Sequence, residues 1–211
     1  MKEKGRGIAA AALLVAACSG PAATTTTQAD APSDTPGSTT TAIITTTQPV
    51  VSVDATFSLG TIVFGEQGRV EVINTGSQAG NVHGHWIAIH PFYLELPSAI
   101  IEVGESVTIA FDPATSPNAL LQAAGLLPHP GASNGEVGLY ANGNFGDPAA
   151  IRDYVEWGAG GHFRSTVAEA AGIWDPERIV TTSGDEGGLV PIAGEPPQLL
   201  GPDLSPLPAE A

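Results

Sequence analysis

Short runs in which apolar and polar residues alternate recur through the middle of the chain, and glycine, proline or asparagine separates them. Residues 69–73 (RVEVI) alternate in this way and stop at Asn74-Thr75-Gly76, which is a turn signal. Further runs of this kind are residues 100–103, 106–111, 136–140 and 151–157. Alternation with a period of two is typical of strands that have one buried face. The pattern predicts a mainly β domain over residues 50–190, an antiparallel β-sandwich.

Two short helical insertions are expected within this domain. Residues 118–127 (NALLQAAGLL) are apolar and lack strict alternation. Thr166 and Glu169 have the spacing of a capping box, with Thr166 as the N-cap. The helix that they begin is expected to end near Ala171, because the glycine at 172 stops it.

The N-terminus has the form of a secretory signal peptide, residues 1–17. Three basic residues precede an unbroken small or apolar run at 8–17, which is far shorter than the roughly 20 residues that span a bilayer. The run ends in Val15-Ala16-Ala17-Cys18, which resembles the lipobox of bacterial lipoproteins. The resemblance implies an exported protein, lipidated at Cys18 and anchored at the extracytoplasmic face of the cell membrane. The alternative is an ordinary signal peptide beside an unmodified Cys18.

Charge and cysteine content limit the classes of function. Residues 19–211 hold 21 acidic residues, four arginines and no lysine, a net charge of −17. Such a body has no basic patch to neutralise phosphates, which argues against nucleic-acid binding. Cys18 is the only cysteine, so an intramolecular disulfide is impossible and thiolate-ligated zinc, iron–sulfur and blue-copper sites lack a ligand. No cofactor is expected.

The two flanks of the domain differ from it in composition. Of residues 19–49, eleven are threonine, and none is aromatic or basic. Such a segment buries too little apolar surface to offset its ordering entropy, so residues 18–49 are expected to form a Thr/Pro-rich disordered linker. Residues 191–211 contain six prolines and are expected to form a disordered tail.

The stretch NVHGHWIAIH, residues 81–90, raises the question of a metal site. On a strand, His83 and His85 share one side, a spacing that metal sites use when a third ligand is present. Candidates for that ligand are His129 and His162. Gly84 interrupts the strand, however, so a turn that leads into a strand at 86–90 is favoured, with His83 in solvent. No metal ligand is predicted, and His83 and His85 remain the candidates of the alternative.

Several segments resemble lamin-tail domains. Residues 70–76 (VEVINTG) and 81–89 (NVHGHWIAI) look like the opening of that family, and residues 104–109 and 151–158 look like its later turn and strands. The resemblance implies an immunoglobulin-like β-sandwich in which Trp86 and Trp157 are core residues. Two features depart from the family pattern: His85 is an extra residue before Trp86, and residues 158–174 have no counterpart.

Catalytic patterns are present but lack their structural context. Residues 131–135 (GASNG) match G-x-S-x-G, yet the motif leads into a strand, whereas a nucleophile elbow follows a strand and leads into a helix. The carboxylates of Asp153 and Glu156 are expected on opposite faces of one strand. Asp185 and Glu186 lie in a glycine-rich loop, where solvated charges are the simpler interpretation.

The sequence therefore favours a non-enzymatic, lipid-anchored cell-surface protein whose β-sandwich binds a protein or cell-envelope partner. One alternative is a cupredoxin-like, metal-binding lipoprotein that uses His83 and His85. Another is a secreted hydrolase with a carboxylate or serine site, which would need a concave pocket that holds convergent polar groups.

Overall fold

The computed structural model describes residues 55–114, 116–123 and 125–208. These residues belong to one compact unit, 47–211. The expected signal peptide, Cys18 and the linker lie outside the described residues.

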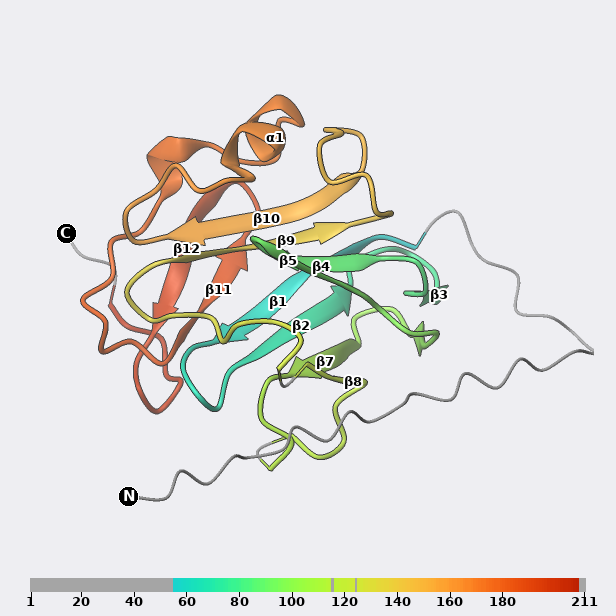
Figure 1. The fold of residues 1–211 in the computed structure, drawn as a ribbon, viewed down its shortest axis with the longest axis horizontal. Helices are drawn as coiled ribbons and strands as arrows, with labels where there is room; N and C mark the ends of the chain where they lie inside the picture. The colour runs from blue at the N-terminus through green and yellow to red at the C-terminus, as the bar shows by residue number, and fades with distance from the viewer. Residues whose placement is uncertain (1–54, 115, 124, 209–211) are drawn as a thin grey trace, which may run out of the picture. The chain divides into compact units, whose positions relative to one another are not determined.

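Two main sheets make up the domain (Figure 1). The larger has the order β12-β11-β1-β2-β7-β8, from β1 (Phe57–Val63), β2 (Arg69–Asn74), β7 (Ser106–Ala110), β8 (Leu121–Gln122), β11 (Gly188–Ile192) and β12 (Glu195–Leu200). The second has the order β10-β9-β4-β5, from β4 (Trp86–Ile89), β5 (Phe92–Glu95), β9 (Gly135–Tyr140) and β10 (Ile151–Trp157). A small third sheet pairs β3 (Gly80–Asn81) with β6 (Ile100–Ile101). Because β7–β8 is the one parallel pair among these named strands, the prediction of a mainly β, antiparallel fold is confirmed. An immunoglobulin-like topology stays a prediction.

The alternating residues supply the core between the sheets. Val70 and Val72 of β2, and Val137 and Leu139 of β9, are wholly buried. Full burial of such side chains stabilises a fold by about 1.5–3 kcal/mol each. A polar contact adds to this packing, because the Leu59 backbone N–H of β1 donates to Asp153 Oδ2 of β10 at 2.8 Å. The arrangement is that of a β-sandwich.

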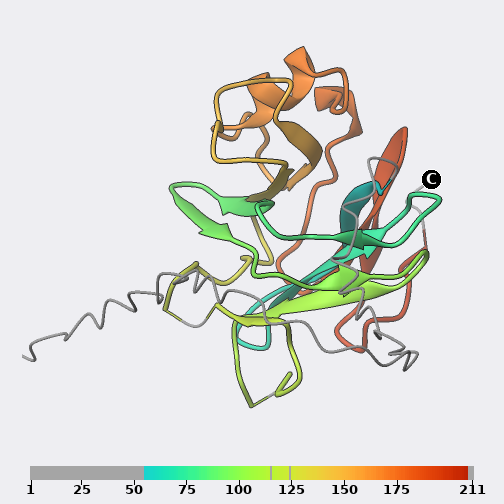
Figure 2. The same cartoon turned by 90° about the vertical axis from the view of Figure 1, so that its right-hand side faces the viewer.

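The outer face of β10 is covered by the segment that contains α1 (Ser165–Ala170) and the short 3-10 helix η1 (Pro176–Arg178) (Figure 2). The helix lies where the sequence predicts one, and Gly172, at φ 72°, follows its end. The predicted N-cap is wrong: Arg164 is the N-cap residue and Thr166 lies inside the helix. Within the described residues, neither α1 nor any other helix has the length and hydrophobicity needed to cross a membrane.

The start of α1 is fixed by buried carboxylates instead of a capping box. The backbone N–H of Arg164 donates to Glu136 at 3.0 Å, and Ser165 Oγ donates to Glu156 at 3.2 Å. Glu169 bonds with Ser165 Oγ at 2.8 Å, one residue before the expected partner. The bonds to Glu136 and Glu156, which come from the strands β9 and β10, outweigh the local capping preference.

The predicted helix at 118–127 is wrong. Residues 121–122 form β8, which runs parallel to β7 at the end of the larger sheet. The N–H of Leu120 donates to Thr108 O at 2.9 Å, and that of Ala123 donates to Ala110 O at 2.7 Å. A ten-residue helix is marginal on its own, whereas pairing with β7 satisfies backbone groups of both segments.

The disordered tail predicted for 191–211 is also wrong over residues 191–208. These residues include the end of β11 and the whole of β12, and Leu200 is buried in the domain. The prolines fit because β12 is the outermost strand of its sheet, where a missing N–H is tolerated, and because Pro191 lies at a register shift of β11. The domain therefore extends well beyond residue 190.

Candidate functional site

The histidine-rich stretch is a turn followed by a strand, as predicted. β4 begins at Trp86, and His83 is exposed in the preceding turn. His85 is half-buried: its Nδ1 lies 3.1 Å from Val82 O, and its ring meets Phe57 edge-on at a centroid distance of 5.0 Å. Burial, only partly opposed by backbone hydrogen bonds, lowers the pKa of His85. Of the two expected core tryptophans, Trp157 is wholly buried, and Trp86 is partly buried.

The metal alternative gains no ligand set from this turn. Among the residues that the structure describes, no group of three or more histidine, cysteine, aspartate or glutamate side chains is placed to hold a metal ion. His83 points into solvent, while the His85 ring packs on Phe57. The proposed third ligands, His129 and His162, line a cavity with His90 at the opposite end of β4. The four residues of β4 lie between His85 and His90, so five extended steps, about 16 Å, separate the two histidines.

We call this second place the histidine cavity. It has a volume of about 330 Å³ and lies between the end of β4, residues 128–131, the start of β9 and residues 157–163. Its polar lining comes from His90, His129, Asn134, Glu136 and His162, and its apolar lining from Ile89, Pro128, Pro130, Trp157 and Phe163. Three of the five histidines of the chain thus surround one cavity.

Hydrogen bonds determine the proton position on two of these imidazoles. His129 Nδ1 lies 2.9 Å from the Gly65 carbonyl oxygen, which only accepts, so Nδ1 carries the proton and Nε2 has the free lone pair in the neutral ring. His162 Nε2 lies 2.9 Å from Asn134 Oδ1, which also accepts the N–H of Ala159 at 3.1 Å. His162 is therefore protonated on Nε2, and its Nδ1 is a free acceptor.

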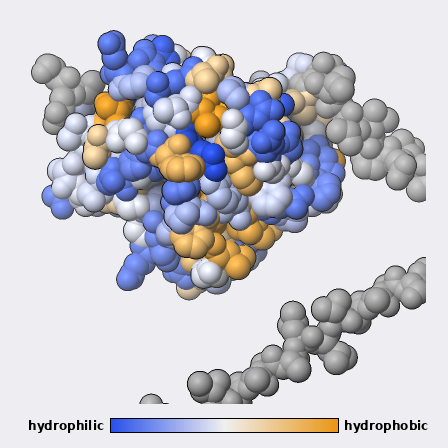
Figure 3. All heavy atoms as spheres, turned by 45° about the horizontal axis from the view of Figure 1, so that its top comes forward, coloured by the Kyte–Doolittle hydropathy of each residue, from blue (hydrophilic) through white to orange (hydrophobic). Residues whose placement is uncertain are grey.

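One apolar wall of the cavity is exposed yet firmly held. The Phe163 ring stacks on His90 at a centroid distance of 3.9 Å, and the Arg164 guanidinium lies 4.8 Å from the Phe163 centroid. Arg164 is itself fixed, because its NH1 donates to Phe145 O at 2.9 Å and its NH2 donates to the Tyr93 hydroxyl. Even so, 60% of Phe163 is accessible to solvent. Figure 3 shows the face on the α1 side of the domain, where apolar residues form separate small patches among hydrophilic ones.

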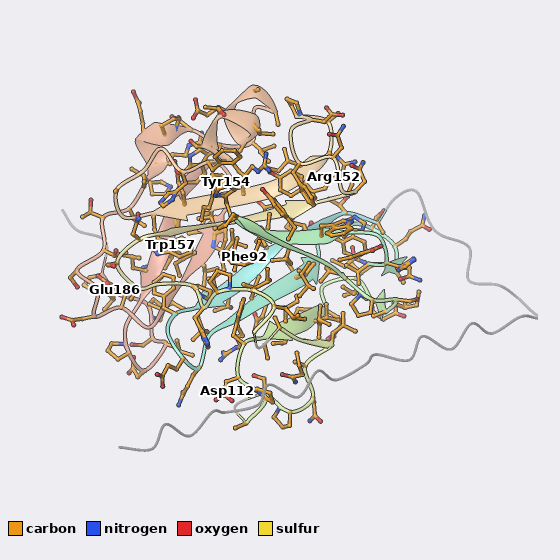
Figure 4. The ribbon with its side chains drawn as sticks, in the orientation of Figure 1. Phe92, Asp112, Arg152, Tyr154, Trp157 and Glu186 are labelled. Carbon is orange, nitrogen blue, oxygen red and sulfur yellow. The ribbon has the colours of Figure 1, made fainter. Side chains whose placement is uncertain are left out.

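Beneath the cavity lies a buried carboxylate cluster. Figure 4 labels Tyr154, whose hydroxyl lies 2.8 Å from Glu136 Oε2 and 3.1 Å from Glu156 Oε2, so one phenol proton serves two carboxyl groups. Glu156 Oε2 also accepts the N–H of His162 at 3.0 Å, and Oε1 accepts Trp174 Nε1–H at 2.9 Å. Burial first, and the two carboxylates second, raise the pKa of Tyr154. The cluster satisfies buried charge with donors, which burial requires.

The catalytic patterns of the sequence are not assembled into a site. Ser133 is exposed in a bend directly before β9 and does not line the histidine cavity. Asp153 and Glu156 lie on opposite faces of β10, as expected: Asp153 bonds to β1 across the sandwich, and Glu156 bonds to the α1 segment. Glu186 accepts the backbone N–H groups of Ser183 and Gly184, both at 2.8 Å, and so holds its own loop.

A second, larger cavity of about 550 Å³ lies between β1, β10, η1 and the β11–β12 turn. Its charged lining consists of Arg152, Asp153, Arg178 and Glu195, so positive and negative charges balance there. Both carboxylate oxygens of Asp153 already accept hydrogen bonds, from the backbone N–H groups of Leu59 and Tyr154, each at 2.8 Å. This cavity lacks a dominant charge that would select one class of ligand.

Sequence reasoning missed His90, Glu136, Tyr154 and Phe163 as parts of a site. Glu136 carried a usable signal, because a carboxylate within the apolar run EVGLY is unusual for a buried strand. The others carry no local signal, since they come together only through the order of the strands.

Comparison of the chain with protein-family models, with curated proteins and with solved structures found no match in any of the three. The lamin-tail resemblance therefore stays a prediction.

Proposed function

We propose that this chain is a non-enzymatic, lipid-anchored protein of the extracytoplasmic cell surface, whose β-sandwich carries a binding site in the histidine cavity. The observation that carries the proposal is the cavity itself: a concave space of about 330 Å³ with convergent polar groups and a rigid aromatic wall. Such a combination is typical of ligand sites.

The lining favours binding over covalent chemistry. Among the described residues, no serine, threonine, cysteine, lysine or tyrosine side chain lines the cavity, so this lining offers no hydroxyl, thiol or amine nucleophile. Its one carboxylate, Glu136, is already bonded through Oε2 to Tyr154 and to the N–H of Arg164. These bonds hold the carboxylate in place as a fixed acceptor.

The binding part of the proposal is tested with the chain from residue 19 onward, labelled with ¹³C and ¹⁵N at histidine. A library of small polar and aromatic fragments is added, and ring signals are followed by NMR. We expect fragments that shift the signals of His129 and His162 together while leaving His83, in its distant turn, unchanged. A library without a single such fragment would show that the cavity is not a ligand site.

The anchor is tested on the full-length chain in a bacterial host that is fed an alkyne-tagged fatty acid. We expect the wild-type protein to be labelled and to sediment with membranes, and Cys18→Ser to lose both properties, because two acyl chains are needed for stable anchoring. Equal labelling of the two proteins would contradict lipidation at Cys18.

A further inference from the structure

We propose that the histidine cavity binds an uncharged saccharide, whose hydroxyl groups donate hydrogen bonds to acceptor atoms of the cavity wall. The inference rests on the proposed function and names the class of ligand for the same site.

The hydrogen-bonding character of the wall comes from the two fixed tautomers. The protons of His129 and His162 point to Gly65 O and Asn134 Oδ1, so Nε2 of His129 and Nδ1 of His162 are left as acceptors. The Glu136 carboxylate adds a third accepting group. The Asn134 amide and the His90 ring also line the cavity and can donate, so the wall suits a ligand whose groups both donate and accept, as every sugar hydroxyl does.

The charge of the domain disfavours sugars that carry a phosphate or carboxylate group. The lining found in the described part of the chain contains no arginine or lysine, and residues 19–211 carry a net charge of −17. Arg164 keeps its charge behind Phe163, but it is not part of the lining, and its NH1 and NH2 already donate to Phe145 O and the Tyr93 hydroxyl. A phosphate or carboxylate group would meet the accepting nitrogens of His129 and His162 and the Glu136 carboxylate, in a negative potential.

Size and apolar lining agree with a ligand of one or two sugar rings. The volume of about 330 Å³ is at the lower end of the range of about 300–1,000 Å³ that small-molecule sites occupy. Phe163, held by His90 and Arg164, and the rings of Pro128 and Pro130 offer rigid apolar walls for the C–H groups of a pyranose. Because these walls do not need to be ordered on binding, little conformational entropy is lost.

The tautomers are measured first, by long-range ¹H–¹⁵N NMR correlation on the free protein near pH 8. We expect a proton on Nδ1 of His129 and on Nε2 of His162. The opposite tautomer at both rings would put donors in the cavity and overturn the inference.

Binding is then measured by NMR titration of the chain from residue 19 onward with glucose, galactose, mannose and N-acetylglucosamine, each beside its 6-phosphate. At least one uncharged sugar should shift the His129 and His162 ring signals saturably, and its 6-phosphate should bind at least tenfold more weakly. The inference fails if no uncharged sugar shifts these signals at tens of millimolar, or if a 6-phosphate binds as well as its parent sugar.

Matched variants separate the accepting nitrogen from the ring. His162→Phe keeps an aromatic ring but removes the accepting Nδ1, together with the Nε2–H bond to Asn134 Oδ1, so the Kd for the best sugar should rise at least about two- to tenfold, the value of one net hydrogen bond. His83→Phe makes the same change in the exposed turn and should leave the Kd unchanged. Thermal unfolding of each variant verifies that it is folded, and equal Kd values for folded His162→Phe and wild type would contradict the proposed contact.

The two proposals fail in different ways. If library fragments shift the cavity signals and no sugar does, the binding site stands and the saccharide is wrong. If neither fragments nor sugars shift them, both are wrong.

Discussion

Replacing Glu156 by glutamine should cost this domain more stability than a change of one atom normally does. The side chain is wholly buried, and each oxygen has two donors. Oε1 accepts from Trp174 Nε1 at 2.9 Å and from Ser165 Oγ at 3.2 Å, while Oε2 accepts from the Tyr154 hydroxyl at 3.1 Å and from the His162 N–H at 3.0 Å. Glutamine turns one of these oxygens into an NH₂ group.

The two hydroxyl groups can adapt to the change, because each has another acceptor: Glu136 for Tyr154 and Glu169 for Ser165. The two N–H groups cannot. Whichever way the amide is oriented, either Trp174 Nε1–H or the His162 N–H faces an NH₂ group and loses its acceptor. A buried donor without a partner costs about 1–3 kcal/mol. For a domain of this size, that lowers the Tm by about 2–12 °C.

The assay is urea unfolding of the chain from residue 19 onward, followed by tryptophan fluorescence. Glu156→Gln should lower the free energy of unfolding by about 1–3 kcal/mol with an unchanged m value. Glu169→Gln is the matched control: that residue is exposed, so the change should stay within about 0.5 kcal/mol. A Glu156→Gln protein as stable as the control would refute the requirement of the Trp174 and His162 N–H groups for this carboxylate.

Three other predictions concern the fold. Burial lowers the pKa of His85 below its value in the unfolded chain, so the unfolded state takes up a proton first and stability should fall as the pH drops below about 6.5. His85→Gln should lose this part of the pH dependence in thermal melts between pH 7 and 5. Parallel curves of Tm against pH for wild type and variant would contradict the prediction. Gly158→Ala should destabilise by about 1–3 kcal/mol or more in urea unfolding, because φ is +83° and an added Cβ would lie 2.3 Å from Ser133 O. A chain that ends at residue 190 should fail to unfold cooperatively in a thermal melt, because it lacks β12; a normal transition would show that β12 is dispensable.

The accuracy of the sequence-based predictions follows from the range of the interactions involved. β2 and the turn at His83 were predictable because the alternation of 69–73 and the glycine at 84, with φ at 80°, are local signals. The segments 118–127 and 191–208 were assigned wrongly because their conformation depends on pairing with β7 and β11. Which strands pair cannot be read from the composition of a segment.

The histidine cavity was out of reach for a similar reason. His90 and His162 are 72 positions apart in the chain, and only the placement of β4, β9 and β10 in one sheet brings them together. The sequence did show that His129 and His162 lie in loops, but not that those loops meet at the same end of a sheet.

The outermost strand β12 has a consequence for how copies of this protein behave when they are crowded. An open strand edge is a template onto which another chain can add its own backbone, and the proposed membrane anchor would raise the local concentration of copies. Pro196 and Pro197 remove two backbone donors from one half of this strand. The other half is paired with the chain that follows the strand, because the Leu207 N–H donates to Leu199 O at 2.9 Å. Because successive N–H groups of a strand point to opposite sides, one of these two prolines faces the open edge, and the proline content that suggested disorder makes this edge a poorer template.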